Sequence, residues 1–199
     1  MASSMKKILE SSFLLSASNL LGRFISFGAV IIITKALNLY EYGALTLAMT
    51  VSAPISLLSS FGLESVIVSD MARFRGELLF GKLKKLIRSY SLSKLLLTTI
   101  FIAIGWYFKP FLVARYGDLV NDYYLLLTLW IYANIGFTIV NAIVNAYEKF
   151  KALAVSDVLE VVFKLVFIVL FWLVGIISVQ YVLLAYVLSK LLVTAFLAI

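Results

Sequence analysis

The sequence contains neither cysteine nor histidine. Their absence excludes disulfide frameworks, cysteine nucleophiles, zinc sites with the usual ligands and imidazole acid–base chemistry. The sequence also lacks a glycine-rich phosphate loop, a pair of carboxylates suited to acid–base catalysis and a cluster of metal-ligating residues. We therefore expect a protein that is not an enzyme, with no catalytic residue, no metal site and no cofactor.

Charged residues are scarce as well. They make up 14% of the 199 residues, while hydrophobic residues make up 63%, and the mean hydropathy is +1.08. Ordinary soluble domains contain about 25% charged and about 45–50% apolar residues. A soluble chain of this length could not bury such an excess, because much of its surface must still face solvent. The composition therefore predicts an all-α integral membrane protein.

The long apolar runs predict six transmembrane helices. Polar stretches such as "KALNLYEYG" and "FKPFLVARYGDLVND" separate them. Between the second and third runs, residues 76–88 place leucines on one helical face and basic residues on the rest, which predicts an interfacial helix lying along the membrane. The expected spans are residues 12–34, 42–62, 90–108, 123–146, 158–178 and 182–199.

The basic residues predict the orientation of the spans. With the N-terminus in the cytoplasm, most lysines and arginines outside the spans lie in inner segments, as the positive-inside rule requires. The first apolar run is too long for a signal peptide and lacks its cleavage pattern, so we expect it to remain as a span. The net charge of +7 is then largely topological, and nucleic acid is not an expected partner. The inner residues are Lys6, Lys7, Arg73, Arg75, Lys82, Lys84, Lys85, Arg88, Lys149 and Lys151, and the outer ones are Lys35, Lys109 and Arg115.

Arg23 is the only charged residue of the first span and lies near its centre. At 100° per residue it shares one helical face with Ser12, Ser16, Asn19 and Ser26. An arginine at the centre of a membrane helix costs about 2.5–3.5 kcal/mol on insertion scales unless it faces water or a partner. The stripe therefore predicts that the first helix lines a wet or protein-lined interior.

Polar residues also mark the last three spans. In the fifth, Glu160 precedes Lys164 by one turn, which suits an ion pair within the helix, and Asp157 lies on the same side. Lys190 lies in the sixth span, so Arg23, Lys164 and Lys190 are three cations at membrane depth. If the polar faces of these spans converge, the interior carries net positive charge and would attract an anion. A guanidinium suits phosphate because its planar fork binds two oxygens. The stripe of the fourth span is Asn134, Thr138, Asn141 and Asn145, and that of the sixth is Tyr186, Lys190 and Thr194.

The polar stripes predict a set of substrate-binding residues, although each feature also has a structural interpretation. Serine and asparagine stripes often hold membrane helices together, at about 0.6–2 kcal/mol per contact. Lys164 could simply pair with Glu160, and Lys190 could be a shallow residue. Pro54, in the second span, more often marks a kink than a ligand site. The predicted substrate-binding residues are Arg23, Asn19, Asn141, Asn145, Lys164 and Lys190.

Residues 20–75 resemble a known family. They contain a Gly-Arg pair in the first span, Tyr42-Gly43 after a short turn, and "FGLESVIVSDMARFR" after the second span. This pattern resembles the opening of polysaccharide flippases of the Wzx type, members of the MOP superfamily that also holds multidrug extruders and lipid II flippases. The resemblance implies two six-helix lobes. Residues 1–199 would then be the N-terminal lobe, with the C-terminal lobe missing, and the unflanked last apolar run agrees with that expectation.

The resemblance also implies a function. Flippases of this type carry lipid-linked oligosaccharides, whose polyprenyl pyrophosphate is anionic, across the cytoplasmic membrane by alternating access, for polysaccharide biosynthesis or export. Arg23 matches an arginine in the first span of the family, whereas Lys164 and Lys190 match no motif. The implied partners are this anionic lipid-linked glycan, the lipid bilayer and the C-terminal lobe. The implied location is the cytoplasmic membrane, as a multi-pass protein.

Two other functions stay open. An ion-coupled multidrug or small-molecule exporter on the same scaffold would need acidic residues for coupling, and only Asp157 and Glu160 are candidates. A membrane scaffold without transport activity would use the polar stripes merely to hold helices together.

Overall fold

The computed structural model describes residues 2–60, 64–116 and 119–198. In these residues the chain is helical, and five helices (α1, α2, α4, α5 and α7) are long and apolar enough to cross a membrane. The expected all-α membrane protein is thereby confirmed. The expected ends of the second span at residue 62 and of the last span at residue 199 lie outside the described residues. The helices are α1 (Ala2–Ala36), α2 (Leu39–Ser60), α3 (Glu64–Gly76), α4 (Phe80–Tyr116), α5 (Leu119–Ala146), α6 (Phe150–Leu173) and α7 (Val179–Ala198).

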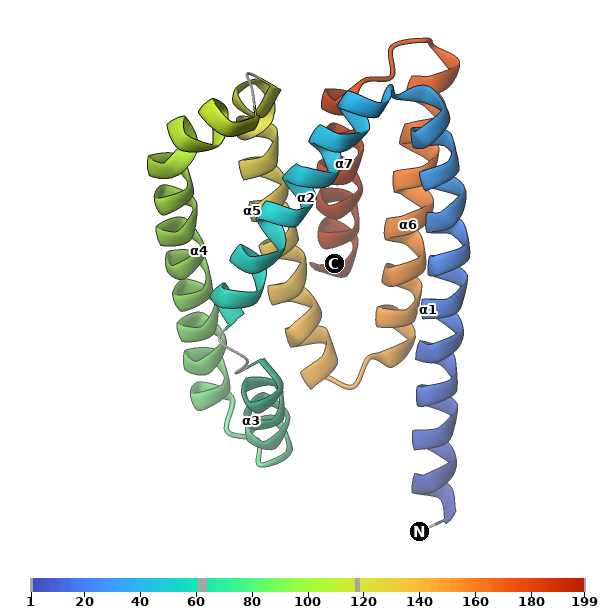
Figure 1. Ribbon diagram of the computed structural model, residues 1–199. Coiled ribbons are helices and arrows are strands. Elements are labelled where there is room, and N and C mark those ends of the chain that lie inside the picture. Colours follow the sequence, from blue (N-terminus) through green and yellow to red (C-terminus); the bar gives the residue numbers. More distant parts are fainter. Residues whose placement is uncertain (1, 61–63, 117–118, 199) are drawn as a thin grey trace.

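Helix α6 has the length of a span but is not among the five helices named above. Asp157, Glu160 and Lys164 interrupt its apolar sequence. Its 24 residues correspond to about 36 Å at 1.5 Å per residue, which exceeds a hydrocarbon core of about 30 Å. Figure 1 shows α6 running alongside α1. The charged residues at the middle of α6 therefore lie beside the part of α1 around Gly22.

The helices form two groups that α2 connects (Figure 1). On one side α1 packs along α6, and on the other α4 packs along α5, with α7 between α5 and α6. Helix α2 crosses the bundle and contacts α4, α5 and α7, while the short α3 lies at the lower end against α4 and α5. Each group has its own apolar core, one centred on Met71 and Ile135 and one on Ile33 and Ile168.

Two helix ends follow from local sequence. Helix α2 begins with a capping box, in which Asn38 Oδ1 accepts a hydrogen bond from the Glu41 backbone N–H (2.9 Å) and Glu41 Oε2 accepts one from the Asn38 N–H (3.0 Å). Helix α6 ends at Leu173, and Gly175, two residues later, has a φ of 76°, which suits the left-handed position that follows a helix. The backbone N–H groups of Gly175 and Ile176 then bond to Trp172 and Phe171 and satisfy the last carbonyls.

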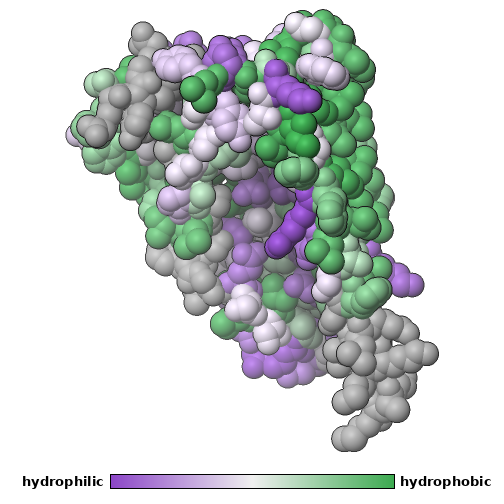
Figure 2. Space-filling model, turned by 45° about the vertical axis from the view of Figure 1, so that its right-hand side comes forward, coloured by the Kyte–Doolittle hydropathy of each residue, from purple (hydrophilic) through white to green (hydrophobic). Residues whose placement is uncertain are grey.

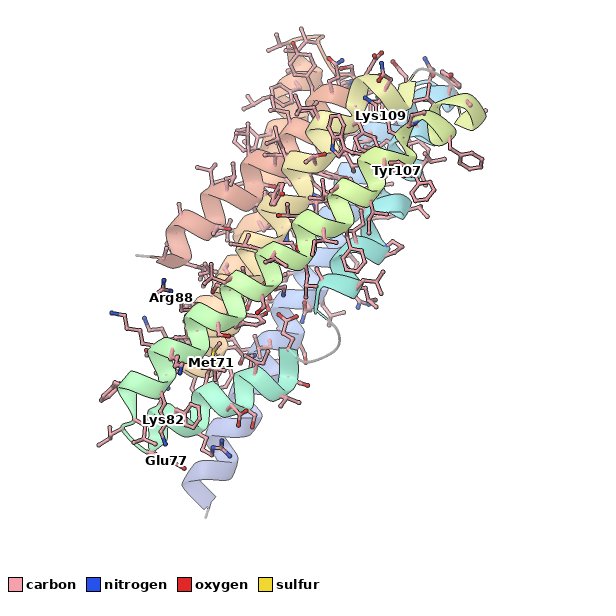
Figure 3. All side chains as sticks on the ribbon, turned by 90° about the vertical axis from the view of Figure 1, so that its left-hand side faces the viewer. Met71, Glu77, Lys82, Arg88, Tyr107 and Lys109 are labelled. Atoms are coloured by element: carbon pink, nitrogen blue, oxygen red, sulfur yellow. The ribbon has the colours of Figure 1, made fainter. Side chains whose placement is uncertain are left out.

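The basic stretch at residues 76–88 forms no separate helix in the structure. Helix α3 ends at Gly76, and residues 82–88 form the first turns of α4, which continues to Tyr116. No glycine or proline occurs between Gly81 and Gly105, so nothing in the sequence ends the helix there. Figure 3 shows Lys82 and Arg88 on the lower part of this long helix. An extension of the third span therefore carries the basic residues.

Leu78, in the turn between α3 and α4, has a φ of 56° and an exposed side chain. A left-handed conformation costs a residue with a Cβ about 1–2 kcal/mol, and glycine avoids this cost. We expect Leu78→Gly to raise the free energy of unfolding by up to about 1 kcal/mol, measured by thermal unfolding in detergent. The control is Leu92→Gly at an exposed leucine inside α4, which should destabilise by about 1 kcal/mol. Destabilisation by Leu78→Gly as well would contradict this prediction.

Candidate functional site

Glu160 is at the centre of an ion cluster formed by α6 and α7. Its Oε2 accepts a hydrogen bond from Lys190 Nζ of α7 at 3.0 Å. Its Oε1 lies 3.9 Å from Lys164 Nζ, one turn further along α6. The three side chains are 16%, 13% and 17% exposed, respectively. The pair expected within the fifth span therefore forms, but the shorter contact joins two helices and was not expected.

Aromatic rings lie against both lysines. Lys190 Nζ is 4.0 Å from the centroid of the Phe137 ring of α5, and Lys164 Nζ is 5.2 Å from that of Tyr186 of α7. A ring face attracts an ammonium group through its quadrupole, most strongly where water is excluded. Helices α5, α6 and α7 therefore hold the two ammonium groups in defined positions around one carboxylate.

Arg23 lies on the same side of the α1–α6 pair as Glu160. A Cβ added at Gly22 would lie 3.7 Å from Cγ2 of Val161, so these two residues mark where the helices touch. Helices α1 and α6 run parallel (Figure 1). The residue after Gly22 and the residue before Val161 therefore point to the same side of the contact, at a similar depth.

The opposite side of this helix pair is apolar. There an apolar groove of about 460 Å³ runs between α1 and α6, with Lys151 near one end. The groove is lined by Leu14, Ala17, Ser18, Leu21, Lys151, Ala154, Val155, Val158 and Leu159. Figure 2 shows hydrophilic residues gathered in a hollow beside α1, with hydrophobic surface along its right-hand side. Helices α1 and α6 thus separate a polar face from an apolar one.

The structure places the six predicted binding residues in three pairs. Lys164 and Lys190 are brought together by Glu160. Arg23 and Asn19 share the exposed polar face of α1, and Arg23 forms no ion pair with any residue that the structure describes. The remaining two, Asn141 and Asn145, lie in the last turns of α5, half-buried and exposed, respectively.

The two lysines are therefore not free cations. With Asp157 and Glu160 beside them, the formal charges of this cluster cancel, whereas the guanidinium of Arg23 keeps an unneutralised charge. Two hydroxyls of the stripes also have partners in their own helices, since Thr138 donates to the Ile135 carbonyl and Thr194 to the Lys190 carbonyl. Arg23 is thus the side chain of the predicted set most available to an external anion.

A buried cation of α4, Lys94, was missed by the sequence analysis. It is 2% exposed, and its Nζ donates to Tyr90 Oη at 3.0 Å and lies 3.4 Å from Glu64 Oε2 of α3. The spacing of Tyr90 and Lys94, one turn apart, is visible in the sequence. The pairing with Glu64 depends on how α3 folds back onto α4, and no periodicity indicates it. This contact ties the start of α3 to the long helix.

One of three comparisons with known proteins identifies a family. A family model described as "Polysaccharide biosynthesis protein" matches residues 8–199, nearly the whole chain. No curated protein and no solved structure matches the sequence. The matched region contains Arg23, Lys94 and the Glu160 cluster, together with every helix that could cross a membrane. The chain therefore belongs to the polysaccharide biosynthesis protein family.

Proposed function

We propose that this protein is a flippase, a transporter rather than an enzyme, that moves a polyprenyl-pyrophosphate-linked oligosaccharide across the cytoplasmic membrane. Membership in the polysaccharide biosynthesis family supports a role in flipping or export in general. The observation that carries the finer proposal is the position of Arg23. It lies on an apolar helix, on the polar side of the contact between α1 and α6, without a described acidic partner.

An unpaired guanidinium at membrane depth is costly unless water or an anion meets it. The pyrophosphate of a lipid-linked glycan is such an anion, and its oxygens match the two-pronged geometry of arginine. Binding of this headgroup beside Arg23 would pair the two charges, which offsets the cost of holding each of them at membrane depth. The sugar would occupy the wet space, while the polyprenyl tail stays in the lipid.

Moving the headgroup from one side of the membrane to the other requires a second half of the transporter. In our proposal the N-terminus is cytoplasmic, the chain forms one lobe, and a second lobe closes the hollow beside α1. Carriers of this kind rock two bundles around a site near the midplane, so that the site opens to each side in turn. Transport then needs no bond to be made or broken, only moderate affinity for the headgroup on both sides.

Ion-coupled export of a small molecule is a second candidate function. The observation that favours it is the pair of carboxylates, Asp157 and Glu160, inside the helix bundle. Acidic residues at membrane depth commonly serve as proton or cation sites in carriers. Such an exporter would move cationic or neutral compounds out of the cell, driven by an ion gradient.

A transport assay with the intact protein in proteoliposomes separates these two functions. Outer-leaflet quenching would follow a fluorescent polyprenyl-pyrophosphate oligosaccharide, and dye efflux would be followed under an imposed proton or sodium gradient. We expect protein-dependent flipping of the lipid and no gradient-driven efflux. Efflux without flipping would contradict the flippase proposal and favour the exporter.

A further inference from the structure

Glu160 is surrounded as a bound anion would be. Each of its two carboxylate oxygens faces a different lysine, Lys190 at 3.0 Å and Lys164 at 3.9 Å. The two lysines come from different helices and are both largely buried. Glu160 is thus the carboxylate in direct contact with both lysines, and its loss would leave two largely buried cations with only Asp157 nearby, which is strongly unfavourable.

Further charged and titratable groups lie close to this cluster on the elements packed around it. Helix α6 itself contributes Asp157, and α7 contributes Tyr186 beside Lys164. Helix α1 contributes Arg23 on the same side of the α1–α6 contact. Helix α2, which contacts α7, places Tyr42 near Tyr186. The face that α5 presents is aromatic, through Phe137.

We propose that Glu160 is an internal counter-anion, which occupies part of the headgroup site in the empty transporter and is displaced by pyrophosphate. This inference rests on the flippase function proposed above. In the loaded state, the phosphate oxygens would take the place of the Glu160 carboxylate at Lys190 and Lys164. Arg23, on the neighbouring helix, would bind the same headgroup from its other side.

Such a competitor would make the site selective. A tethered carboxylate acts at a high effective concentration, about millimolar or more for short tethers. A monovalent anion at ordinary concentration would not displace it, because it offers no more charge than Glu160 does. Pyrophosphate carries several charges and can engage both lysines and Arg23 together. The same competition would favour release, since Glu160 recaptures the lysines as the headgroup leaves.

The test measures binding of inorganic pyrophosphate to the purified intact protein by calorimetry. We expect Glu160→Gln to bind pyrophosphate about tenfold more tightly than wild type, because the amide no longer competes for the lysines. The matched control is Asp70→Asn, which removes a carboxylate from the exposed Asp70–Arg73 pair of α3. The affinity of this control variant should equal that of wild type.

Two further variants make the result specific to the cluster. The gain in Glu160→Gln should disappear when Lys190→Met is added, since the freed ammonium group is then lost. Glu160→Asp keeps the charge on a shorter side chain and should give a smaller gain, of about twofold to fivefold. It serves as the test if the glutamine variant does not fold.

Unchanged or weaker pyrophosphate binding by the folded Glu160 variants would overturn the proposal, as would a gain that persists without Lys190. Flipping by the wild-type protein, measured in the same preparation, separates this failure from that of the proposed function. If wild type flips the lipid-linked glycan but the Glu160 variants gain no affinity, the flippase stands without an internal counter-anion. If wild type does not flip it, the proposed function fails first.

Discussion

Replacing Glu64 by glutamine should lower the free energy of unfolding by roughly 3 kcal/mol, because it leaves a buried ammonium group without its counter-charge. Lys94 is 2% exposed, whereas Glu64 is 40% exposed. The carboxylate can therefore hydrate when it is alone, but the ammonium group cannot. Lys94→Met removes the charge and keeps an unbranched apolar side chain, so it should cost less than about 1.5 kcal/mol. The removal of the more exposed partner should thus do the greater damage.

Thermal and denaturant unfolding in detergent would measure this asymmetry. Asp70→Asn, which breaks an exposed ion pair on α3, is the matched control and should change stability by less than about 1 kcal/mol. A larger loss for Lys94→Met than for Glu64→Gln would show that the packing of the lysine stem matters more than its charge. That result would contradict our interpretation of the contact between α3 and α4.

Replacing Arg23 by alanine should slow flipping of a pyrophosphate-linked oligosaccharide by about tenfold to a hundredfold. A charge-assisted hydrogen bond contributes about 1.5–3 kcal/mol, and a change of about 1.4 kcal/mol corresponds to a factor of ten in rate. Arg23 is exposed and has no ion pair among the described residues, so the variant should fold and insert normally. Arg23→Lys should restore part of the rate, because it keeps the charge but loses the two-pronged geometry.

The control is Lys35→Ala, which removes an exposed cation from the last turn of the same helix. It should leave the flipping rate within about twofold of wild type, because Lys35 lies more than three turns from Arg23. An Arg23→Ala variant that flips as fast as wild type would rule out the phosphate-binding role. Equal losses in both variants would point to a general effect of charge on α1.

The composition and apolar runs were sufficient to predict an all-α membrane protein, because a bilayer imposes helix length and hydrophobicity directly on the sequence. Contacts within one helix could be predicted too, since Glu160 and Lys164 are one turn apart. Contacts between helices could not, because they depend on packing. Lys190 pairs with Glu160, and Lys94 with Glu64, across 30 residues in each case.

Helix boundaries were harder to predict than helices. The basic residues before Tyr90 suggested an interfacial helix because of their charge, but the backbone runs through them into α4. A helix continues where no glycine or proline interrupts it, whereas charge indicates how deep a segment lies in the membrane. The prediction used charge to separate two helices, although charge alone does not end a helix. The turn at Leu78 illustrates a further limit, because nothing in a leucine indicates a positive φ.

The side on which Arg23 lies also required the structure. Periodicity predicts which residues share the face of α1, but not what that face meets. The contact at Gly22 and Val161 places Arg23 with Glu160 and leaves the apolar groove on the other side. The family resemblance and the geometry thus support the same residue on independent grounds.

The decisive measurement removes charge from the substrate instead of the protein. Proteoliposomes with the intact wild-type protein would receive one fluorescent oligosaccharide on two lipids, a polyprenyl pyrophosphate and an uncharged polyprenyl ether, and outer-leaflet quenching would follow both. We predict protein-dependent flipping of the pyrophosphate-linked glycan at least about tenfold faster than of the neutral one. Equal rates for the two lipids would contradict recognition of an anionic headgroup, and with it the role that we assign to Arg23.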